Sequence, residues 1–169
     1  SYKKNKPRRI AIFSDAHALY EPTLAILEDA RLNGVDEIYS LGDNIGTGPN
    51  PKEVIDLLEE YNVKSIMGNH ELYMLNGVDM FKEHFDRTGG YRTAQLNSAW
   101  TKSKLSNKEI SNIKMYPKTI ELMLGGKKII LCHSIKDFNT NISIINRREF
   151  DKVIQGHIHF EDEEDNLYT

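Results

Sequence analysis

Potential metal-binding side chains in this sequence follow short apolar segments. Five of the six histidines do so, together with two aspartates and one asparagine: Asp15, His17, Asp43, Asn69, His70, His133, His157 and His159. Their donors are carboxylates, imidazoles and an amide, with no thiolate. Such a set suits Mn²⁺, Fe, Zn²⁺ or Mg²⁺ rather than a cysteine-based structural zinc site.

The apolar segments that precede these residues alternate with helical patterns. "RRIAIFSD" is followed by a helical pattern over residues 22–33, "DEIYSLGD" by another over 51–61, and "VKSIMGNH" comes next. This alternation predicts β-α-β-α-β units around a parallel sheet, and therefore an α/β fold. The carboxyl ends of parallel strands share one edge, so we expect the polar side chains to converge there.

Two of the candidate pairs have the same spacing. Asp15 and His17, like His157 and His159, stand two positions apart. On extended backbone the two side chains of such a pair point to the same side of the chain. We therefore expect each pair to act together.

The size of the set favours two cations over one. Two cations require about eight protein ligands, of which one can be shared. Seven candidates with one bridging carboxylate supply that number: Asp15, His17, Asp43, Asn69, His133, His157 and His159. Such a pair, about 3.5–4 Å apart, carries surplus positive charge and can share a hydroxide, so a phosphate ester is the expected substrate.

The rest of the chain gives no sign of a second domain. Residues 72–117 read as helices, one of which begins at a cap on Ser106. Gly125 and Gly126 predict the tight turn of a β-hairpin, and a short helix at "NRREF" precedes a strand at "DKVIQG". The aromatic residues of the helical segment are expected to pack it against the sheet rather than stack on a base: Tyr73, Phe81, Phe85, Tyr91 and Trp100.

Composition excludes several classes of protein. The 169 residues carry a net charge of −3, which gives no general attraction to nucleic acid, although the first residues are basic and Glu161 to Asp165 are acidic; we read both ends as solvated. No apolar run is long enough to span a membrane, and no secretory signal precedes the first strand, so a cytoplasmic protein is expected. The lone cysteine, Cys132, is expected to be a buried apolar side chain.

Five sequence blocks together resemble a known family. "SDAH", "LGDN", "GNHE", "CHS" and "GHIH" occur in the order found in calcineurin-like metallophosphoesterases, in particular their small bacterial phosphodiesterase branch. The resemblance also covers "TGPNP" and "AWTKSKLS", and so most of the chain. It implies a single domain with a two-sheet α/β/β/α sandwich and a cap-like helical insertion at about residues 72–117. Relatives continue beyond the last block, so part of the second sheet is expected to be absent.

The resemblance also implies a role for each residue. Asp15, His17 and His159 would hold the first metal, Asn69, His133 and His157 the second, and Asp43 would bridge both. His70 would bind no metal; it would orient the phosphate and help to stabilise or protonate the leaving oxygen. The expected reaction is hydrolysis of a small phosphate ester, a diester rather than a monoester, by a bridging hydroxide. Mn²⁺ is the favoured metal, with Fe, Zn²⁺, Ni²⁺ or Mg²⁺ as alternatives.

Two features of the sequence differ from the family pattern, and one rival function stays open. Members usually carry glycine where this chain has Ala18 and Ser134, which is expected to reshape the floor of the site without deleting a ligand. The family's protein phosphatases carry an Asp-Arg pair after the second block, where this chain reads "GDNIGTG". The rival is a non-catalytic binding module of the same fold, which acts through protein contacts; such relatives lose the third-block histidine, here His70.

Overall fold

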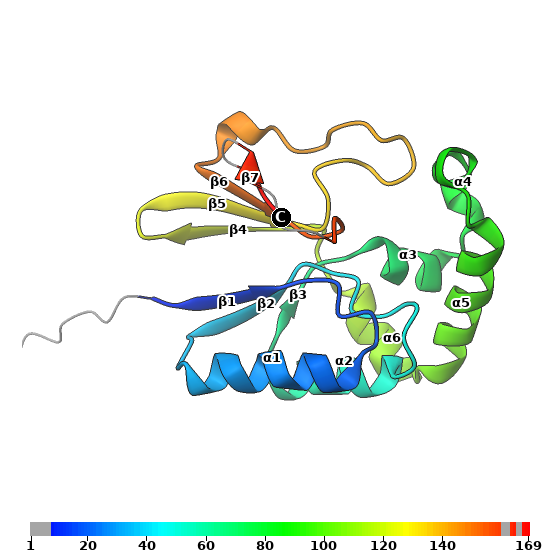
Figure 1. Ribbon diagram of the computed structural model, residues 1–169, viewed down its shortest axis with the longest axis horizontal. Helices are drawn as coiled ribbons and strands as arrows, with labels where there is room; N and C mark the ends of the chain where they lie inside the picture. The colour runs from blue at the N-terminus through cyan, green and yellow to red at the C-terminus, as the bar shows by residue number, and fades with distance from the viewer. Residues whose placement is uncertain (1–7, 160–162, 165–166) are drawn as a thin grey trace, which may run out of the picture.

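A parallel sheet carries the first three sequence blocks. The computed structural model describes residues 8–159, 163–164 and 167–169. Strands β1 (Ile10–Phe13), β2 (Glu37–Ser40) and β3 (Lys64–Ser65) pair in parallel in that order. Helices α1 (Tyr20–Leu32) and α2 (Pro51–Glu60) lie along one face of this sheet (Figure 1). The predicted β-α-β-α-β unit is therefore confirmed.

The helices are held to the first sheet by an apolar core. Leu27 of α1 and Val54, Ile55 and Leu58 of α2 are almost completely buried and belong to one cluster. These positions recur at helical spacing, so each helix turns one apolar face to the strands. Pro51 begins α2, where its missing N–H costs no hydrogen bond.

The second sheet is built around the predicted hairpin. Strands β4 (Thr119–Leu124) and β5 (Lys127–Cys132) pair antiparallel, and both turn residues, Gly125 and Gly126, have positive φ. β6 (Lys152–Gln155) then pairs parallel to β5. The short strands β7 (Glu163–Glu164) and β8 (Leu167–Tyr168) complete the order β4-β5-β6-β8-β7 within the described residues.

The two sheets stack face to face, as Figure 1 shows. Tyr39, Leu41 and Ile66 from the first sheet and the segments after it pack against Ile129 and Leu131 of β5. This confirms the expected two-sheet α/β architecture.

An irregular layer covers the outer face of the second sheet. Residues 133–151, which include the short 3₁₀ helix η2 (Arg147–Glu149), pack Ile135, Ile145 and Phe150 against it. Cys132 is 1 % exposed between these layers, and burial raises its pKa to about 12, as expected for an inert apolar side chain.

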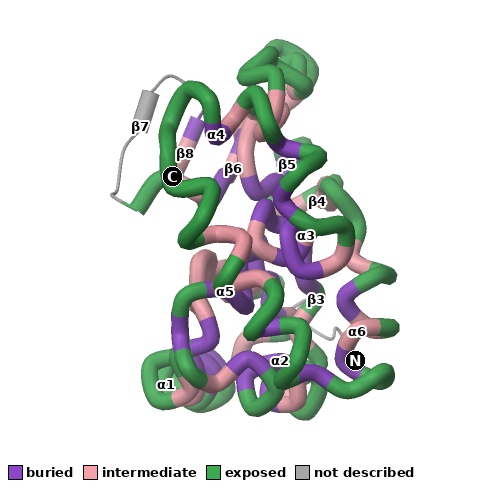
Figure 2. The backbone as a smooth tube through the Cα atoms, turned by 90° about the vertical axis from the view of Figure 1, so that its right-hand side faces the viewer, coloured by how far each residue is buried: buried purple, intermediate pink, exposed green. Residues whose placement is uncertain are grey.

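The remaining helical segments lie between β3 and β4 in the sequence, and the last of them packs Ile113 into the same apolar core as α1 and α2. They are α3 (Asn69–Asn76), the 3₁₀ helix η1 (Asp79–Phe81), α4 (Lys82–Thr88), α5 (Tyr91–Lys104) and α6 (Asn107–Lys114). Ser106 caps α6 in a reciprocal arrangement with Glu109, as its position predicts. Figure 2 shows buried backbone where α3 meets the strands and exposed outward turns on the helices.

The prediction for the aromatic residues was only partly correct. Tyr73, Phe81 and Phe85 form a buried cluster. Tyr91 and Trp100 are instead about two-fifths exposed, because both lie on α5, of which only Thr101 is buried.

The structure describes the charged ends of the sequence only in part. Arg8 is paired with Glu37 and is therefore not simply solvated; Lys3, Lys4, Lys6, Glu161, Asp162 and Asp165 lie outside the described residues. Throughout the part of the chain that the structure describes, every helix is too short or too polar to cross the bilayer.

Candidate metal centre

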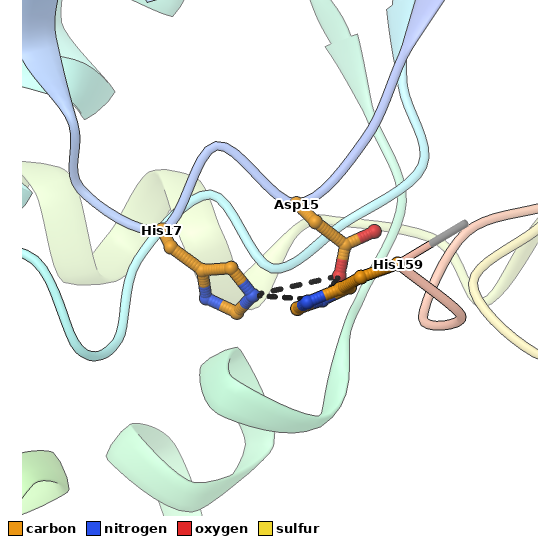
Figure 3. Close-up of side chains that lie close together, drawn as sticks. All are labelled: Asp15, His17 and His159. Atoms are coloured by element: carbon orange, nitrogen blue, oxygen red, sulfur yellow. Dashed lines mark hydrogen bonds and ion pairs between the residues drawn. The ribbon is translucent and has the colours of Figure 1, made fainter.

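The loop after β1 and the segment after β6 meet in a first group of donors. Asp15, His17 and His159 point toward one another in Figure 3. Nε2 of His159 lies 3.1 Å from Oδ1 of Asp15, and Nε2 of His17 lies 3.6 Å from the same oxygen. The two Nε2 atoms are 3.3 Å apart.

A second group gathers at the ends of β5 and β6. Nε2 of His133 lies 3.3 Å from Oδ2 of Asp43 and 3.0 Å from Oδ1 of Asn69. Nδ1 of His157 lies 3.1 Å from that same amide oxygen. On its far side, Nδ1 of His133 lies 2.8 Å from the carbonyl oxygen of Leu41, which fixes this nitrogen as the donor and aims Nε2 at the group.

Asp43 connects the two groups. It is 2 % exposed and shares a potential metal-binding set with His17 and His70 as well as one with His133 and His157. The backbone N–H of His70 donates to Oδ1 of Asp43 at 2.9 Å. All eight residues singled out in the sequence therefore lie in one continuous cluster.

Close backbone approaches hold this cluster in place. A Cβ on Gly68 would lie 2.2 Å from Oδ1 of Asp43, and one on Gly46 would lie 2.2 Å from Nδ1 of His70. Only glycine at these two positions lets the carboxylate and the imidazole take their present positions.

The extended-backbone explanation for the two spaced pairs was wrong. Asp15, His17 and His157 have φ values of 57°, 46° and 68°, so the chain turns in the left-handed region directly beyond β1 and β6. Asp15 and His17 still meet, but His157 and His159 join different groups. Left-handed backbone is costly for residues other than glycine, and such strain is concentrated at functional sites.

The two departures from the family pattern delete none of the candidate donors. Ala18 is fully buried with φ of 56°, and its N–H donates to the carbonyl oxygen of Asn44. The hydroxyl of Ser134 accepts from the N–H of Lys136.

Charge within the first group is balanced by hydrogen bonding. Burial would raise the pKa of Asp15, but His17 and Ser14 hydrogen-bond to its carboxylate and bring that pKa well below its ordinary value. Burial would likewise lower the pKa of His17, yet Asp15 and Asp43 raise it above the usual range. The first group thus favours an ionised carboxylate beside imidazoles.

The second group is more strongly polarised. Burial opposes a charge on His133, but the Asp43 carboxylate raises the pKa of His133 to about 9. Burial lowers the pKa of both His70 and His157. His133 is therefore the imidazole that the negative charge of Asp43 affects most, and a cation would compete with its proton.

Sequence reasoning missed the role of Glu71. This carboxylate is fully buried and accepts from the N–H groups of Asp43, Asn44 and Gly68 at 2.7–3.0 Å. Burial and the neighbouring Asp43 raise its pKa to about 7. Its place three residues after Gly68, at the start of a helix, is the signal that indicates a carboxylate bonding back to backbone N–H groups.

The spacing of the donor atoms fits metal coordination. Metal–ligand bonds of about 2.1 Å place tetrahedral ligands about 3.4 Å apart. Within each group the neighbouring donor atoms lie 3.0–3.6 Å apart. Nδ1 of His17 is also buried without a hydrogen-bond partner among the described residues. Both groups therefore have the donor types and spacing of divalent-metal sites.

Two curated proteins have sequences similar to that of this chain. The sequence is 34 % identical over 125 residues to the uncharacterized protein MJ0912 of Methanocaldococcus jannaschii, covering 74 % of this chain and 49 % of the relative. It is 30 % identical over 132 residues to serine/threonine-protein phosphatase 2 of Salmonella typhimurium, covering 75 % and 58 %. The chain thus spans about half the length of these curated relatives.

This chain also matches a solved structure and the model of a protein family. The metallophosphoesterase from Sphaerobacter thermophilus matches with a TM-score of 0.61 and 26 % identity, covering 92 % of this chain and 62 % of that one. The profile of the calcineurin-like phosphoesterase superfamily domain matches residues 9–167. The chain, with its five blocks gathered at one edge of two stacked sheets, belongs to the calcineurin-like phosphoesterase superfamily.

Proposed function

We propose that this protein hydrolyses small phosphate esters with the help of two divalent cations. The main support for this proposal is that two groups of donor atoms meet at Asp43. Within each group, the neighbouring donor atoms are as far apart as two ligands of one metal ion would be. Asp15, His17 and His159 would hold one cation. Asn69, His133 and His157 would hold the other, and Asp43 would contact both.

The donor set indicates which cations fit. Imidazole, carboxylate and amide ligands bind several divalent cations. We propose Mn²⁺ as the bound cation, with Fe, Zn²⁺, Ni²⁺ or Mg²⁺ as alternatives. When bound, the two cations would supply Lewis-acid charge and a bridging hydroxide as nucleophile.

His70 is proposed to act on the phosphate without binding a cation. Its ring lies against the rings of His17 and Tyr73, with centroids 5.1 and 5.3 Å away. Burial lowers the pKa of His70, which favours the neutral imidazole, and its ring N–H can donate a hydrogen bond. We assign this N–H to the leaving oxygen, where negative charge grows as the P–O bond breaks.

The rival function is a binding module that has the fold without turnover. The presence of His70 favours an enzyme. Its proposed role is in hydrolysis, and non-catalytic proteins of this fold lose the histidine at this position. The test is hydrolysis of bis-p-nitrophenyl phosphate by protein loaded with Mn²⁺, Ni²⁺, Zn²⁺ or Mg²⁺, with chelated protein as the control. Metal uptake with hydrolysis that chelation abolishes is the expected result. Metal uptake without hydrolysis of any mono- or diester would favour the binding module.

Protein dephosphorylation is the second enzymatic candidate. It is favoured by the 30 % identity to a protein named a serine/threonine phosphatase, and opposed by the "GDNIGTG" sequence, which lacks the Asp-Arg pair. A phosphoserine peptide added to the same panel separates the two. We expect its kcat/KM to be at least about tenfold below that of the diester, a difference of about 1.4 kcal/mol in transition-state binding.

A further inference from the structure

A cleft opens beside the second donor group. It has a volume of about 470 Å³ and lies between α4, the segment that follows β5, and residues of β6, β8 and the segments after them. Of the eight candidate residues, His157 is the one that lines the cleft, so the cleft adjoins the second donor group at this side chain. Organic ligands occupy pockets of roughly this size, about 300–1,000 Å³, whereas a phosphate group alone leaves most of such a space empty.

Two walls of the cleft are tied to each other. The Arg87 guanidinium on α4 donates to the carbonyl oxygens of Asn139 and Phe138, at 2.6 and 3.3 Å. The backbone N–H of His84 donates to the side-chain oxygen of Asn139 at 3.2 Å. Since α4 and residues 134–141 are held together in this way, the cleft is preformed and requires no closure before it binds a ligand.

The lining combines apolar surface with charged groups of both signs. Phe138 has its ring centroid 5.6 Å from those of both His133 and His157, which fixes one aromatic wall directly beside the candidate metal ligands. Ile135, Ile158 and Leu167 add apolar surface, whereas Lys136 and Arg87 are cationic and Asp137 is anionic. An aromatic or nucleoside-sized group fits this lining better than a small alkyl group does.

The cleft and His70 lie at different parts of the centre. His70 contacts His17 and Tyr73 and does not line the cleft, whereas the cleft begins at His157 and Phe138. If the leaving oxygen faces His70, the second ester group occupies another position on the tetrahedral phosphorus, away from His70. The position of the cleft therefore matches the group that remains attached to phosphorus after hydrolysis.

We propose that this cleft binds the retained ester group of a phosphodiester, so that the preferred substrates are diesters whose retained group is aromatic or nucleoside-sized. The inference rests on the proposed hydrolase function and deepens it. The reaction is balanced by water: hydroxide forms a new P–O bond, the P–O bond to the leaving group breaks, and the retained group leaves as a phosphate monoester. A monoester substrate would leave the cleft empty.

The test varies only the retained group. The p-nitrophenyl esters of methyl phosphate and of thymidine 5′-phosphate share one leaving group, and both retained groups are alkyl esters of similar intrinsic reactivity. With Mn²⁺-loaded protein, we expect kcat/KM to be at least about tenfold higher for the thymidine ester. Equal values would overturn the assignment of the cleft while the hydrolysis itself supports the proposed function.

A filled cleft provides the second measurement. Thr88 is exposed on α4 and lines the cleft, so Thr88→Trp places a large ring in it. The ratio of kcat/KM for the thymidine ester to that for the methyl ester should fall at least about tenfold. Thr93→Trp, an exposed position on α5 outside the cleft, is the control and should keep the wild-type ratio.

The outcomes of these measurements are distinct. A ratio that is unchanged in Thr88→Trp, with thermal unfolding and bound metal as in the wild type, would overturn the cleft assignment alone. Absence of hydrolysis of both esters with every cation in the panel would overturn the cleft assignment together with the proposed function.

Discussion

At Asp43 one buried carboxylate meets both halves of the candidate centre. Its Oδ2 faces Nε2 of His133 at 3.3 Å, and its Oδ1 accepts from the backbone of His70. A carboxylate that is 2 % exposed requires compensating positive charge, which two cations would provide. Charge at this residue, rather than its shape, is therefore the property on which catalysis should depend.

Asp43→Asn should lower kcat for bis-p-nitrophenyl phosphate at least about 100-fold, because the amide keeps the size of the side chain but removes the bridging charge. Steady-state kinetics together with elemental analysis of bound metal check this expectation. Asp56→Asn is the matched control, since Asp56 is an exposed carboxylate on α2 paired with Lys52 and should leave kcat unchanged. A wild-type rate in Asp43→Asn would contradict the bridging role.

His70→Ala should retain bound metal and slow turnover by about 10²-fold or more for a poor alkoxide leaving group. The loss should be smaller for p-nitrophenolate, because a good leaving group needs less stabilisation from the imidazole N–H. Parallel kinetics on both kinds of ester measure the difference. An equal loss for the two leaving groups, or loss of the metals, would show that His70 does not act on the leaving oxygen.

Among the elements, the strands are short and the loops after them hold the donors. The alternation of apolar segments and helical patterns predicted the parallel strands and the helices α1 and α2 closely. The hairpin could be predicted because Gly125 and Gly126 have a specific turn chemistry. The left-handed backbone at Asp15, His17 and His157 could not, since aspartate and histidine adopt positive φ more often than most residues but still do so only in a minority of cases.

Contacts between segments that are distant in the chain could not be predicted from the sequence either. Phe138 lies in a segment without regular periodicity, so its contact with His133 and His157 depends on how residues 134–141 cross the edge of the sheet. His84 is half-buried, and its backbone N–H donates to the side-chain oxygen of Asn139. Burial of α4 against a loop is decided by tertiary packing, which local patterns do not encode.

Gly46→Ala should lower kcat about as strongly as substitution of His70, by about 10²-fold, with the metals still bound. The new methyl group would lie 2.2 Å from Nδ1 of His70 and must push the ring away. Gly77→Ala is a matched control, because Gly77 has a similar φ, +81° against +88°, while its Cβ would meet nothing within 4 Å. Equal effects of the two substitutions on kcat would mean that backbone strain, not the His70 ring, causes the loss.

On the scale of the whole molecule, the centre joins the two sheets. The first donor group combines residues after β1 and β6, and the second combines residues after β2, β3, β5 and β6. Cation binding would therefore stabilise the folded state by linking the sheets. At cation concentrations above the dissociation constant, this stabilisation grows with the logarithm of the concentration. Without cations, the same charges should make stability depend on pH.

The free energy of unfolding of chelated protein should decrease as pH rises from about 6.5 to 9. The folded pKa of His133 is raised from 6.5 to about 9, so its protonated form stabilises the fold fully below pH 6.5, and this contribution is lost as pH rises through 9. The slope should approach about 1.4 kcal/mol per pH unit. Urea unfolding at a series of pH values measures it, and Asp43→Asn should flatten this part of the curve because the raising charge is gone.

The most direct test of the two-cation centre is anomalous diffraction from crystals of Mn²⁺-loaded protein. Two peaks are expected, about 3.5–4 Å apart. One should lie within bonding distance of Asp15, His17 and His159, the other within bonding distance of Asn69, His133 and His157, and both should contact Asp43. A single peak would contradict the two-cation centre. Fully occupied Mn²⁺ peaks elsewhere on the protein, with none at these side chains, would contradict it as well. Either result would also contradict the hydrolase function that is based on this centre.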